Sequence, residues 1–308
     1  MPKEVFGAGY SFLKDPQLMT LEEIGRIAES FVKLGVQKIR LTGGEPLLRQ
    51  DIPELVSMLK NKLLVPDVAI TTNGWLLEKA VPALKIAGLN RLNVSVDSLD
   101  DNTAGGLNGL GFKISRVLSA IDAACDAAIP VKINCVIQKG VNDHQIIELC
   151  DYFRKRKIPI RFIEFMDVGN TNRWNASKVV SAKAIVELIN AQWPLIPVGP
   201  AYRGEVASRY SYSDGAGEIG LISSVTEPFC KDCHRARLSA DGKFYTCLFA
   251  SFGWDVLACL RAGADPKELT AFVSRIWKGR LDKYSDDRAE LLASGEARAK
   301  IEMSYIGG

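Results

Sequence analysis

The sequence predicts an α/β fold in which a parallel sheet curves into a barrel or partial barrel and a smaller cysteine-rich module follows. Two observations lead to this prediction. Apolar strands alternate with amphipathic helices through the first half of the chain, as they do in right-handed βαβ units. The alternation stops after Met166, and the cysteine-rich stretch comes later. We therefore expect residues 1–167 to form the barrel and residues 168–308 to form the second module.

The elements follow from local patterns. Thr20, two glutamates and apolar residues at helical spacing predict a capped helix that ends at Gly35. The predicted parallel sheet has five strands, at residues 36–42, 68–72, 91–97, 131–138 and 160–166. The helices between them are expected at residues 52–60, 76–87, 114–127 and 143–156. In the second half we expect a helix at 182–190, short strands within 195–225, and helices at 254–262, 266–277 and 286–292.

Composition excludes several classes of protein. With 308 residues and 47% apolar content, the chain can bury a full core. A net charge of +3 gives no general attraction to nucleic acid or to membranes, and no apolar run reaches the length of a membrane span. Seven cysteines, an odd number, argue against a disulfide framework and for a reducing compartment. We therefore expect a cytoplasmic protein, or a protein of the mitochondrial matrix if its source is eukaryotic.

The cysteine-rich stretch carries thiols in the spacing C-x2-C-x13-C, at Cys230, Cys233 and Cys247. Asp241-Gly242 is a hairpin signal that would return the last thiol to the first two. Such a trio leaves one metal position open, which water or His234 would fill in a zinc site and a substrate could fill in a four-iron cluster. Arg235 and Arg237 in the same turn favour an anionic ligand beside the metal, although they could also pair with the negative charge of a cluster itself. A structural zinc site is the alternative.

Basic residues stand inside strands that should be apolar on both faces. Lys38 and Arg40 are two residues apart and share a face, while Lys132 and Arg161 lie near the starts of two other strands. If these charges face into the barrel, they imply a polyanionic ligand such as a triphosphate. The alternative is that Lys38, Lys132 and Arg161 reach water from the strand starts.

Four of the predicted strands end in residues suited to binding a ligand: TGGEP at 42–46, TTNG at 71–74, SVDS at 95–98 and EFMD at 164–167. Functional groups collect at the carboxyl ends of parallel strands, and paired glycines let a ligand approach the backbone closely. The series along one sheet edge therefore predicts a ligand site.

The chain resembles the GTP 3′,8-cyclase (MoaA) family of molybdenum-cofactor biosynthesis, in the radical S-adenosylmethionine superfamily. The resemblance rests on the blocks MPKEVFG, KIRLTGGEPLLR, TTNG, NVSVD, VIQKGVND, IRFIEFMDVGN, FCKDCHRARLSADGKFYTCLFA, DKYSDDR and the final GG. It implies a partial (β/α)6-type, TIM-like barrel of the radical SAM type. It also implies conversion of GTP to (8S)-3′,8-cyclo-7,8-dihydroguanosine 5′-triphosphate, by hydrogen abstraction from the ribose C3′ and addition of that carbon to guanine C8.

The resemblance also implies roles for individual residues. S-adenosylmethionine would lie against Gly44, Ser95 and Met166. GTP would contact Lys38, Arg40, Thr71, Lys132, Arg161, Arg235, Ala236 and Arg237. Cys230, Cys233 and Cys247 would hold a second [4Fe-4S] cluster that meets the guanine base, and Gly307-Gly308 would reach into the active site. A homodimer is expected, with cyclic pyranopterin monophosphate synthase as the downstream partner.

The sequence departs from the family at its start. Family members carry a first strand and a C-x3-C-x2-C loop, the ligands of a first [4Fe-4S] cluster, directly before the block that begins here at Met1. We expect that Met1 is an internal methionine taken as a start, that the barrel lacks its first strand, and that the polypeptide as written has no cyclase activity. Three readings stay open: an active cyclase whose first residues are missing, a shortened non-catalytic GTP-binding iron–sulfur protein, and a zinc-binding scaffold without nucleotide.

Overall fold

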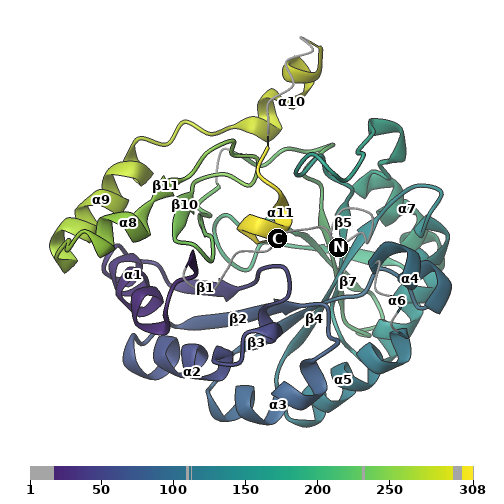
Figure 1. The fold of residues 1–308 in the computed structure, drawn as a ribbon. Coiled ribbons are helices and arrows are strands. Elements are labelled where there is room, and N and C mark those ends of the chain that lie inside the picture. Colours follow the sequence, from purple (N-terminus) through teal and green to yellow (C-terminus); the bar gives the residue numbers. More distant parts are fainter. Residues whose placement is uncertain (1–16, 109–110, 112, 231–232, 294–299, 308) are drawn as a thin grey trace.

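One curved eight-stranded sheet organises the molecule (Figure 1). The computed structural model describes residues 17–108, 111, 113–230, 233–293 and 300–307, so the MPKEVFG block and Gly308 lie outside it. The strand order is β1-β2-β3-β4-β5-β8-β7-β6, and β1 to β5 and β8 run parallel. The parallel strands are Lys38–Leu41 (β1), Asp67–Thr72 (β2), Arg91–Ser95 (β3), Val131–Ile137 (β4), Ile160–Glu164 (β5) and Glu218–Ile222 (β8). The antiparallel ones are Leu195–Val198 (β6) and Ser208–Tyr212 (β7).

Helices cover the outer side of this sheet, as Figure 1 shows for α2, α3, α5 and α6. They are Ile52–Ser57 (α2), Leu77–Ile86 (α3), Asp101–Asn108 (α4), Ile114–Asp126 (α5), Ile146–Lys155 (α6) and Ala182–Gln192 (α7). Helix α5 buries Ile114, Val117, Ile121 and Ala124, residues spaced three or four apart, so one stripe faces the sheet. The main core therefore lies between sheet and helices, and the inner side of the sheet is left to the site.

The predicted α/β partial barrel is confirmed, but the predicted parallel sheet is one strand too short. Strand β8 pairs with β5 in parallel register, with Ile160 opposite Ile219 and Phe162 opposite Leu221. Its short run lies among glycine-rich turns, which led us to place it in the second module. The division at residue 167 remains a prediction, and the sheet continues beyond it through β6, β7 and β8.

A small antiparallel sheet follows the cysteine-rich stretch: Arg237–Leu238 (β9), Lys243–Tyr245 (β10) and Trp254–Asp255 (β11). The prediction of a helix from residue 254 was wrong for its first two residues, since these pair with β10 and Asp255 then caps the helix Val256–Arg261 (α8). The helix Leu21–Lys33 (α1), with the predicted cap at Thr20, packs beside α8 and Pro266–Lys278 (α9). A second core of Ile27, Phe244 and neighbouring apolar residues joins them.

Of the last described segments, only the one that carries α11 lies near the centre of the molecule. Helix Tyr284–Ala293 (α10) leads away from the small sheet, and Met303–Ile306 (α11) lies over the middle of the barrel in Figure 1. The C-terminal end of the described chain is therefore placed inside the ring of strands, next to the inner side of the sheet.

Candidate active site

A cavity of approximately 2970 Å³ lies on the inner side of the sheet. It is bordered by the carboxyl ends of the parallel strands, by the cysteine-rich stretch and by the C-terminal segment. The predicted site residues that line it are Lys38, Arg40, Gly44, Thr71, Ser95, Arg161, Met166, Cys230, Cys233, Arg235, Ala236, Arg237 and Cys247. Segments far apart in sequence thus meet at one space.

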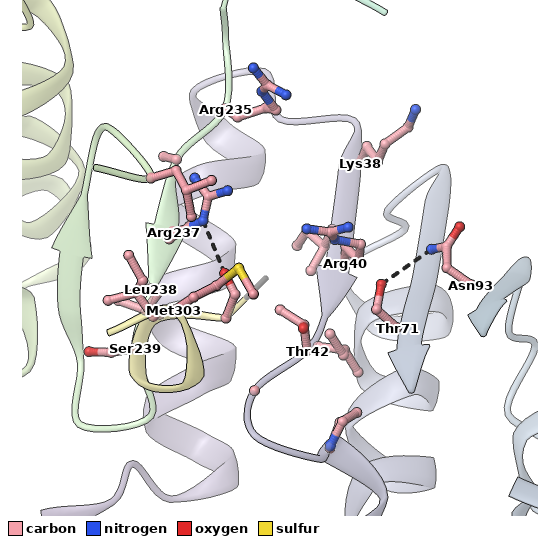
Figure 2. Close-up of a pocket in the computed structure, with 18 of the residues that line it drawn as sticks. Lys38, Arg40, Thr42, Thr71, Asn93, Arg235, Arg237, Leu238, Ser239 and Met303 are labelled. Atoms are coloured by element: carbon pink, nitrogen blue, oxygen red, sulfur yellow. Dashed lines mark hydrogen bonds between the residues drawn. The ribbon is translucent and has the colours of Figure 1, made fainter. Parts of the chain in front are cut away.

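Arginines from three strands converge on this cavity: Arg40 from β1, Arg161 from β5 and Arg237 from β9. Figure 2 shows Arg40 and Arg237 on facing elements, with Lys38 and Arg235 above them. Burial, followed by repulsion from neighbouring arginines, lowers the pKa of Arg161 and of Arg237 to about 10. The pKa of Arg40 is also lowered, first by the protein atoms that surround it and then by the charges of Arg235 and Arg91. Its side chain nevertheless stays accessible from the cavity. A polyanion bound among these guanidiniums would relieve the repulsion.

Arg161 is held by a polar chain that crosses the sheet. Its Nη2 donates to Asn93 Oδ1. Asn93 Nδ2 in turn donates to Thr71 Oγ1 at 3.4 Å, as Figure 2 shows. Gly220, opposite on β8, makes room, since a Cβ there would lie 2.9 Å from Arg161 Cγ. Arg161 Nε is buried and has no hydrogen-bond partner among the described residues. Sequence reasoning missed Asn93, although an asparagine inside the apolar strand RLNVS was a usable signal.

Lys132 is the one predicted GTP residue that does not line the cavity as the structure describes it. It stands on β4 opposite Asn93, half-buried beside Arg161. Burial and then the charge of Arg161 lower its pKa. Lys132 therefore adds positive charge behind the arginine cluster rather than at the cavity surface.

Two carboxylates organise the strand ends. Glu45 Oε1 accepts from Thr72 Oγ1 at 2.7 Å and Oε2 accepts from the Asn73 backbone N–H at 2.8 Å, which ties the loop after β1 to the end of β2. Asp97 Oδ1 accepts from the Val136 N–H at 2.8 Å. Burial raises the pKa of Asp97 to about 6 despite this hydrogen bond. These contacts fix the loop that carries Gly44 and the segment that follows Ser95 at the end of β3.

The cysteine-rich stretch forms the predicted hairpin, with Leu238 opposite Phe244. Cys233 N–H donates to the Cys230 carbonyl at 3.1 Å, and Arg235 Nη2 lies 3.2 Å from Cys233 Sγ. Burial would raise the pKa of the Cys233 thiol, but the charge of Arg235 and hydrogen bonds from two arginines lower it to about 7. Burial raises the pKa of Cys247.

The donor chemistry of this stretch fits an iron–sulfur cluster, since thiols that open to one cavity beside guanidiniums suit an anionic cluster. Within the described ranges, however, no three His, Cys, Asp or Glu side chains are grouped closely enough to hold an ion. His234 Nε2 lies 2.9 Å from the Arg203 carbonyl oxygen instead of joining the thiols. The assignment of the three thiols to a cluster therefore rests on donor chemistry and on the shared cavity.

The C-terminal segment closes one side of the cavity. Arg237 Nε donates to the Gly307 carbonyl at 3.1 Å (Figure 2). Gly307 has φ +75°, and a Cβ there would lie 2.5 Å from Thr42 Cγ2. Tyr305 donates its hydroxyl to Asp241 in the hairpin turn. The segment is thus fastened to both the hairpin and the end of β1.

A buried ionic network holds the segment's other end. Asp167, directly after Met166, accepts from Arg288 Nε at 2.9 Å, Lys300 Nζ at 2.7 Å and the Tyr284 hydroxyl at 2.6 Å. Burial opposes ionisation of Asp167, yet these hydrogen bonds and charges lower its pKa. The motif DKYSDDR, at residues 282–288, supported the family resemblance but had no predicted structural role. The structure shows that its tyrosine and arginine anchor the end of β5.

Comparison with known proteins agrees with this architecture. Residues 6–153 match the Radical SAM superfamily, and residues 158–286 match Molybdenum Cofactor Synthesis C. A curated protein of Staphylococcus epidermidis named GTP 3′,8-cyclase is 48% identical over 309 residues, covering 100% of this chain and 91% of the relative. A Staphylococcus saprophyticus protein of the same name is 47% identical with the same coverage. The chain belongs to the GTP 3′,8-cyclase family.

Solved structures support the barrel. The crystal structure of Streptococcus suis SuiB has a TM-score of 0.60 at 17% identity and covers 88% of this chain and 62% of that one. SuiB bound to S-adenosylmethionine has a TM-score of 0.51 at 22% identity, covering 60% and 42%. At these identities the likeness shows the fold alone.

Membership of the GTP 3′,8-cyclase family makes the chain a radical SAM enzyme of the lyase class, in molybdenum-cofactor synthesis. Membership of the radical SAM superfamily implies the use of S-adenosylmethionine and an iron–sulfur cluster. In the part of the chain that the structure describes, no helix is both long enough and apolar enough to cross a membrane.

Proposed function

We propose that the cavity binds GTP and that the chain serves its cyclisation to (8S)-3′,8-cyclo-7,8-dihydroguanosine 5′-triphosphate. The observation that carries the proposal is the convergence of Arg40, Arg161 and Arg237 on a cavity shared with the cysteine-rich stretch. Guanidiniums are strong ligands of phosphate oxygens, and a cluster in which burial and then neighbouring arginines lower each pKa forms a site suited to a triphosphate. The curated relatives' name agrees with this substrate.

In this proposal each side of the cavity has a separate task. The basic residues Lys38, Arg40, Arg161, Arg235 and Arg237, with Lys132 behind them, hold the nucleotide. Thr71 acts through Asn93 to orient Arg161. Ala236, between two arginines and without a bulky side chain, leaves the backbone of the turn open to the purine.

The strand-end residues serve the cofactor side. Gly44, Ser95 and Met166 would hold S-adenosylmethionine, which, with a reduced iron–sulfur cluster, supplies the hydrogen-abstracting radical. Glu45 keeps the glycine loop in place through its bonds to the end of β2. The segment that ends at Gly307 narrows the cavity and would keep water from the reacting nucleotide.

Cys230, Cys233 and Cys247 would hold a [4Fe-4S] cluster next to the purine. In such a cluster three thiolates would leave one iron without a protein ligand, and a substrate nitrogen or oxygen could bind there. We further propose that residues 168–308 form the module for this cluster, and that the protein is a homodimer whose product passes to cyclic pyranopterin monophosphate synthase.

A second candidate is a non-catalytic GTP-binding iron–sulfur protein. The 308 residues hold seven cysteines, none in a C-x3-C-x2-C spacing, which favours it for the polypeptide as written. In this second candidate function, the protein would bind GTP without forming 5′-deoxyadenosine.

The experiment is anaerobic reconstitution with iron and sulfide, followed by metal analysis, GTP titration and assay for 5′-deoxyadenosine and the cyclised nucleotide. Tight GTP binding that requires Arg237 supports the nucleotide site, and formation of both products supports the cyclase. GTP binding without either product favours the non-catalytic reading. Zinc without GTP binding would contradict both and leave a metal scaffold.

A further inference from the structure

Tyr202 lies in the loop between β6 and β7 and borders the basic side of the cavity. The residue is 45% exposed, so part of it stays open to a ligand. Lys38 Nζ lies 3.8 Å from the centroid of its ring, which brings a loop distant in sequence into contact with the start of β1. None of the roles proposed for the cavity uses this tyrosine.

The loop that carries Tyr202, residues 199–207, is fixed by contacts of its own. The Arg203 carbonyl oxygen lies 2.9 Å from His234 Nε2, so the loop is joined to the cysteine-rich stretch. The Glu205 N–H donates to the Tyr202 carbonyl at 3.2 Å, and the Glu205 carboxylate accepts from a backbone N–H within the same loop at 2.6 Å. The loop therefore holds Tyr202 at a set place while its side chain reaches β1.

The Tyr202 hydroxyl belongs to the cluster of cations that borders the cavity. Burial lowers the pKa of Arg40 and of Arg161, and Tyr202 acts on both pKa values in the opposite direction. Coulomb interactions fall with distance, so the hydroxyl lies near both guanidiniums. Lysine and arginine side chains can donate hydrogen bonds but cannot accept them. A phenol among such cations therefore has its donor available for an anionic oxygen that binds there.

We propose that Tyr202 is a nucleotide-binding residue whose hydroxyl donates to a phosphate oxygen of GTP and whose ring holds Lys38 toward the same phosphates. The inference rests on the nucleotide site in the proposed function and adds to it a neutral hydrogen-bond donor from the β6–β7 loop. The phosphates rather than the purine are its partner, because its neighbours are cations of β1 and β5 and Lys38 already covers its ring.

The experiment compares the wild-type chain with Tyr202→Phe, which removes only the hydroxyl, and Tyr202→Leu, which also removes the ring. Tyr152→Phe and Tyr152→Leu are matched controls, because Arg156 lies 3.7 Å from the Tyr152 ring centroid and neither residue lines the cavity as the structure describes it. Folding of each protein is checked by circular dichroism. Calorimetric titrations then measure the affinity for GTP and for inorganic triphosphate.

We expect Tyr202→Phe to weaken the binding of GTP and of inorganic triphosphate alike, by about threefold to tenfold, as for the loss of one hydrogen bond. Tyr202→Leu should weaken both further, because Lys38 loses the ring beside its ammonium group. In chains that also carry Lys38→Ala, this additional loss should disappear while the loss from Tyr202→Phe remains. Both Tyr152 variants should match the wild type.

Wild-type affinity in the Tyr202 variants, together with a loss of GTP binding in Arg237→Ala, would overturn this inference while the nucleotide site stands. A loss for GTP with unchanged binding of inorganic triphosphate would place the hydroxyl at the guanosine part and would also overturn it. If the wild-type chain does not bind GTP, or binds it equally after Arg237→Ala, the proposed function itself fails. If Tyr202→Leu does not fold, Tyr202→Phe decides the question, since it removes a single oxygen atom.

Discussion

Arg237 donates through Nε to the carbonyl oxygen of Gly307 at 3.1 Å, and this bond joins the return hairpin of the cysteine-rich stretch to the end of the chain. Arg237 is also one of the guanidiniums whose pKa is lowered by burial and by its neighbours. The C-terminal segment therefore helps to set the direction of a residue that we assign to GTP.

Gly307→Ala should displace this segment. The residue has φ +75°, and its new methyl group would meet Thr42 Cγ2 at 2.5 Å. We expect GTP affinity to fall by roughly threefold to tenfold. A tenfold loss corresponds to about 1.4 kcal/mol of binding free energy. Gly263→Ala is the control, because φ there is +96° and nothing lies within 4 Å. Calorimetric titration should show wild-type affinity in the control; equal affinity in both variants would argue against a role for the segment in binding.

Removal of single basic residues should weaken nucleotide binding. Arg235→Ala loses a cation that lines the cavity, and a charge-assisted hydrogen bond contributes about 1.5 to 3 kcal/mol. Lys132→Ala loses a positive charge that lies behind Arg161 and attracts the nucleotide without a direct hydrogen bond. We expect affinity to fall by several fold or more in each. Lys183→Ala, at a side chain that is 82% exposed on α7, should leave it unchanged. Unaltered titration curves for both site variants would count against the proposed site.

Asp97 should make stability depend on pH. Its pKa is about 6 in the folded protein and near 3.8 when unfolded, so the folded state binds more protons between these values and loses stability as pH rises through them. Asp97→Asn keeps an oxygen that accepts from Val136 but carries no charge. Urea unfolding should show the variant to be more stable at pH 7.5 by up to about 3 kcal/mol, with the advantage shrinking toward pH 4. A difference that does not vary with pH would contradict this assignment.

Asp167→Asn should be strongly destabilising. The substitution leaves Arg288, with 5% of its side chain exposed, and Lys300, with 13%, without their shared carboxylate. Breaking a buried ion pair in this way costs about 3 to 5 kcal/mol. Asp151→Asn breaks an exposed pair with Lys155, which is worth about 0 to 1 kcal/mol. Chemical denaturation should show a much larger loss in the free energy of unfolding for Asp167→Asn than for Asp151→Asn. A similar loss in both variants would contradict a stabilising role for the Asp167 network.

Local patterns predicted most of the fold. The cap at Thr20, the strands β1 to β5 and the hairpin at Asp241-Gly242 are each encoded within about ten residues, where periodicity and turn chemistry are informative. Strand β8 was predicted in the second module rather than in the parallel sheet, because its partner β5 is distant in sequence. A five-residue apolar run does not indicate which strand it will pair with. The predicted helix at 254 was wrong for a different reason: Trp254 and Asp255 pair with Phe244 and Lys243 before the helix begins, and helical spacing alone does not reveal that pairing.

The site was predictable by residue type but not by arrangement. Arg40, Arg161 and Arg237 stood out as charges in strands or beside cysteines, and the structure brings them to one cavity. Lys132 looked equivalent in sequence, yet its position on β4 leaves it behind Arg161. Asn93 acts through its contact with Arg161, which is far away in the chain, and no local pattern reveals such a contact. The cofactor roles came from the family resemblance rather than from spacing.

The parallel pairing of β5 with β8 also bears on how the chain is made. Ile160 of β5 pairs with Ile219 of β8, which is synthesised roughly sixty residues later. At ordinary rates of synthesis this takes about 3 to 12 seconds. Until then, the backbone edge of β5 on the nascent chain has no partner strand. During that interval an apolar strand edge is open to pairing with other nascent chains. Yield of native protein should therefore depend on chaperone supply and on translation speed across residues 165–217.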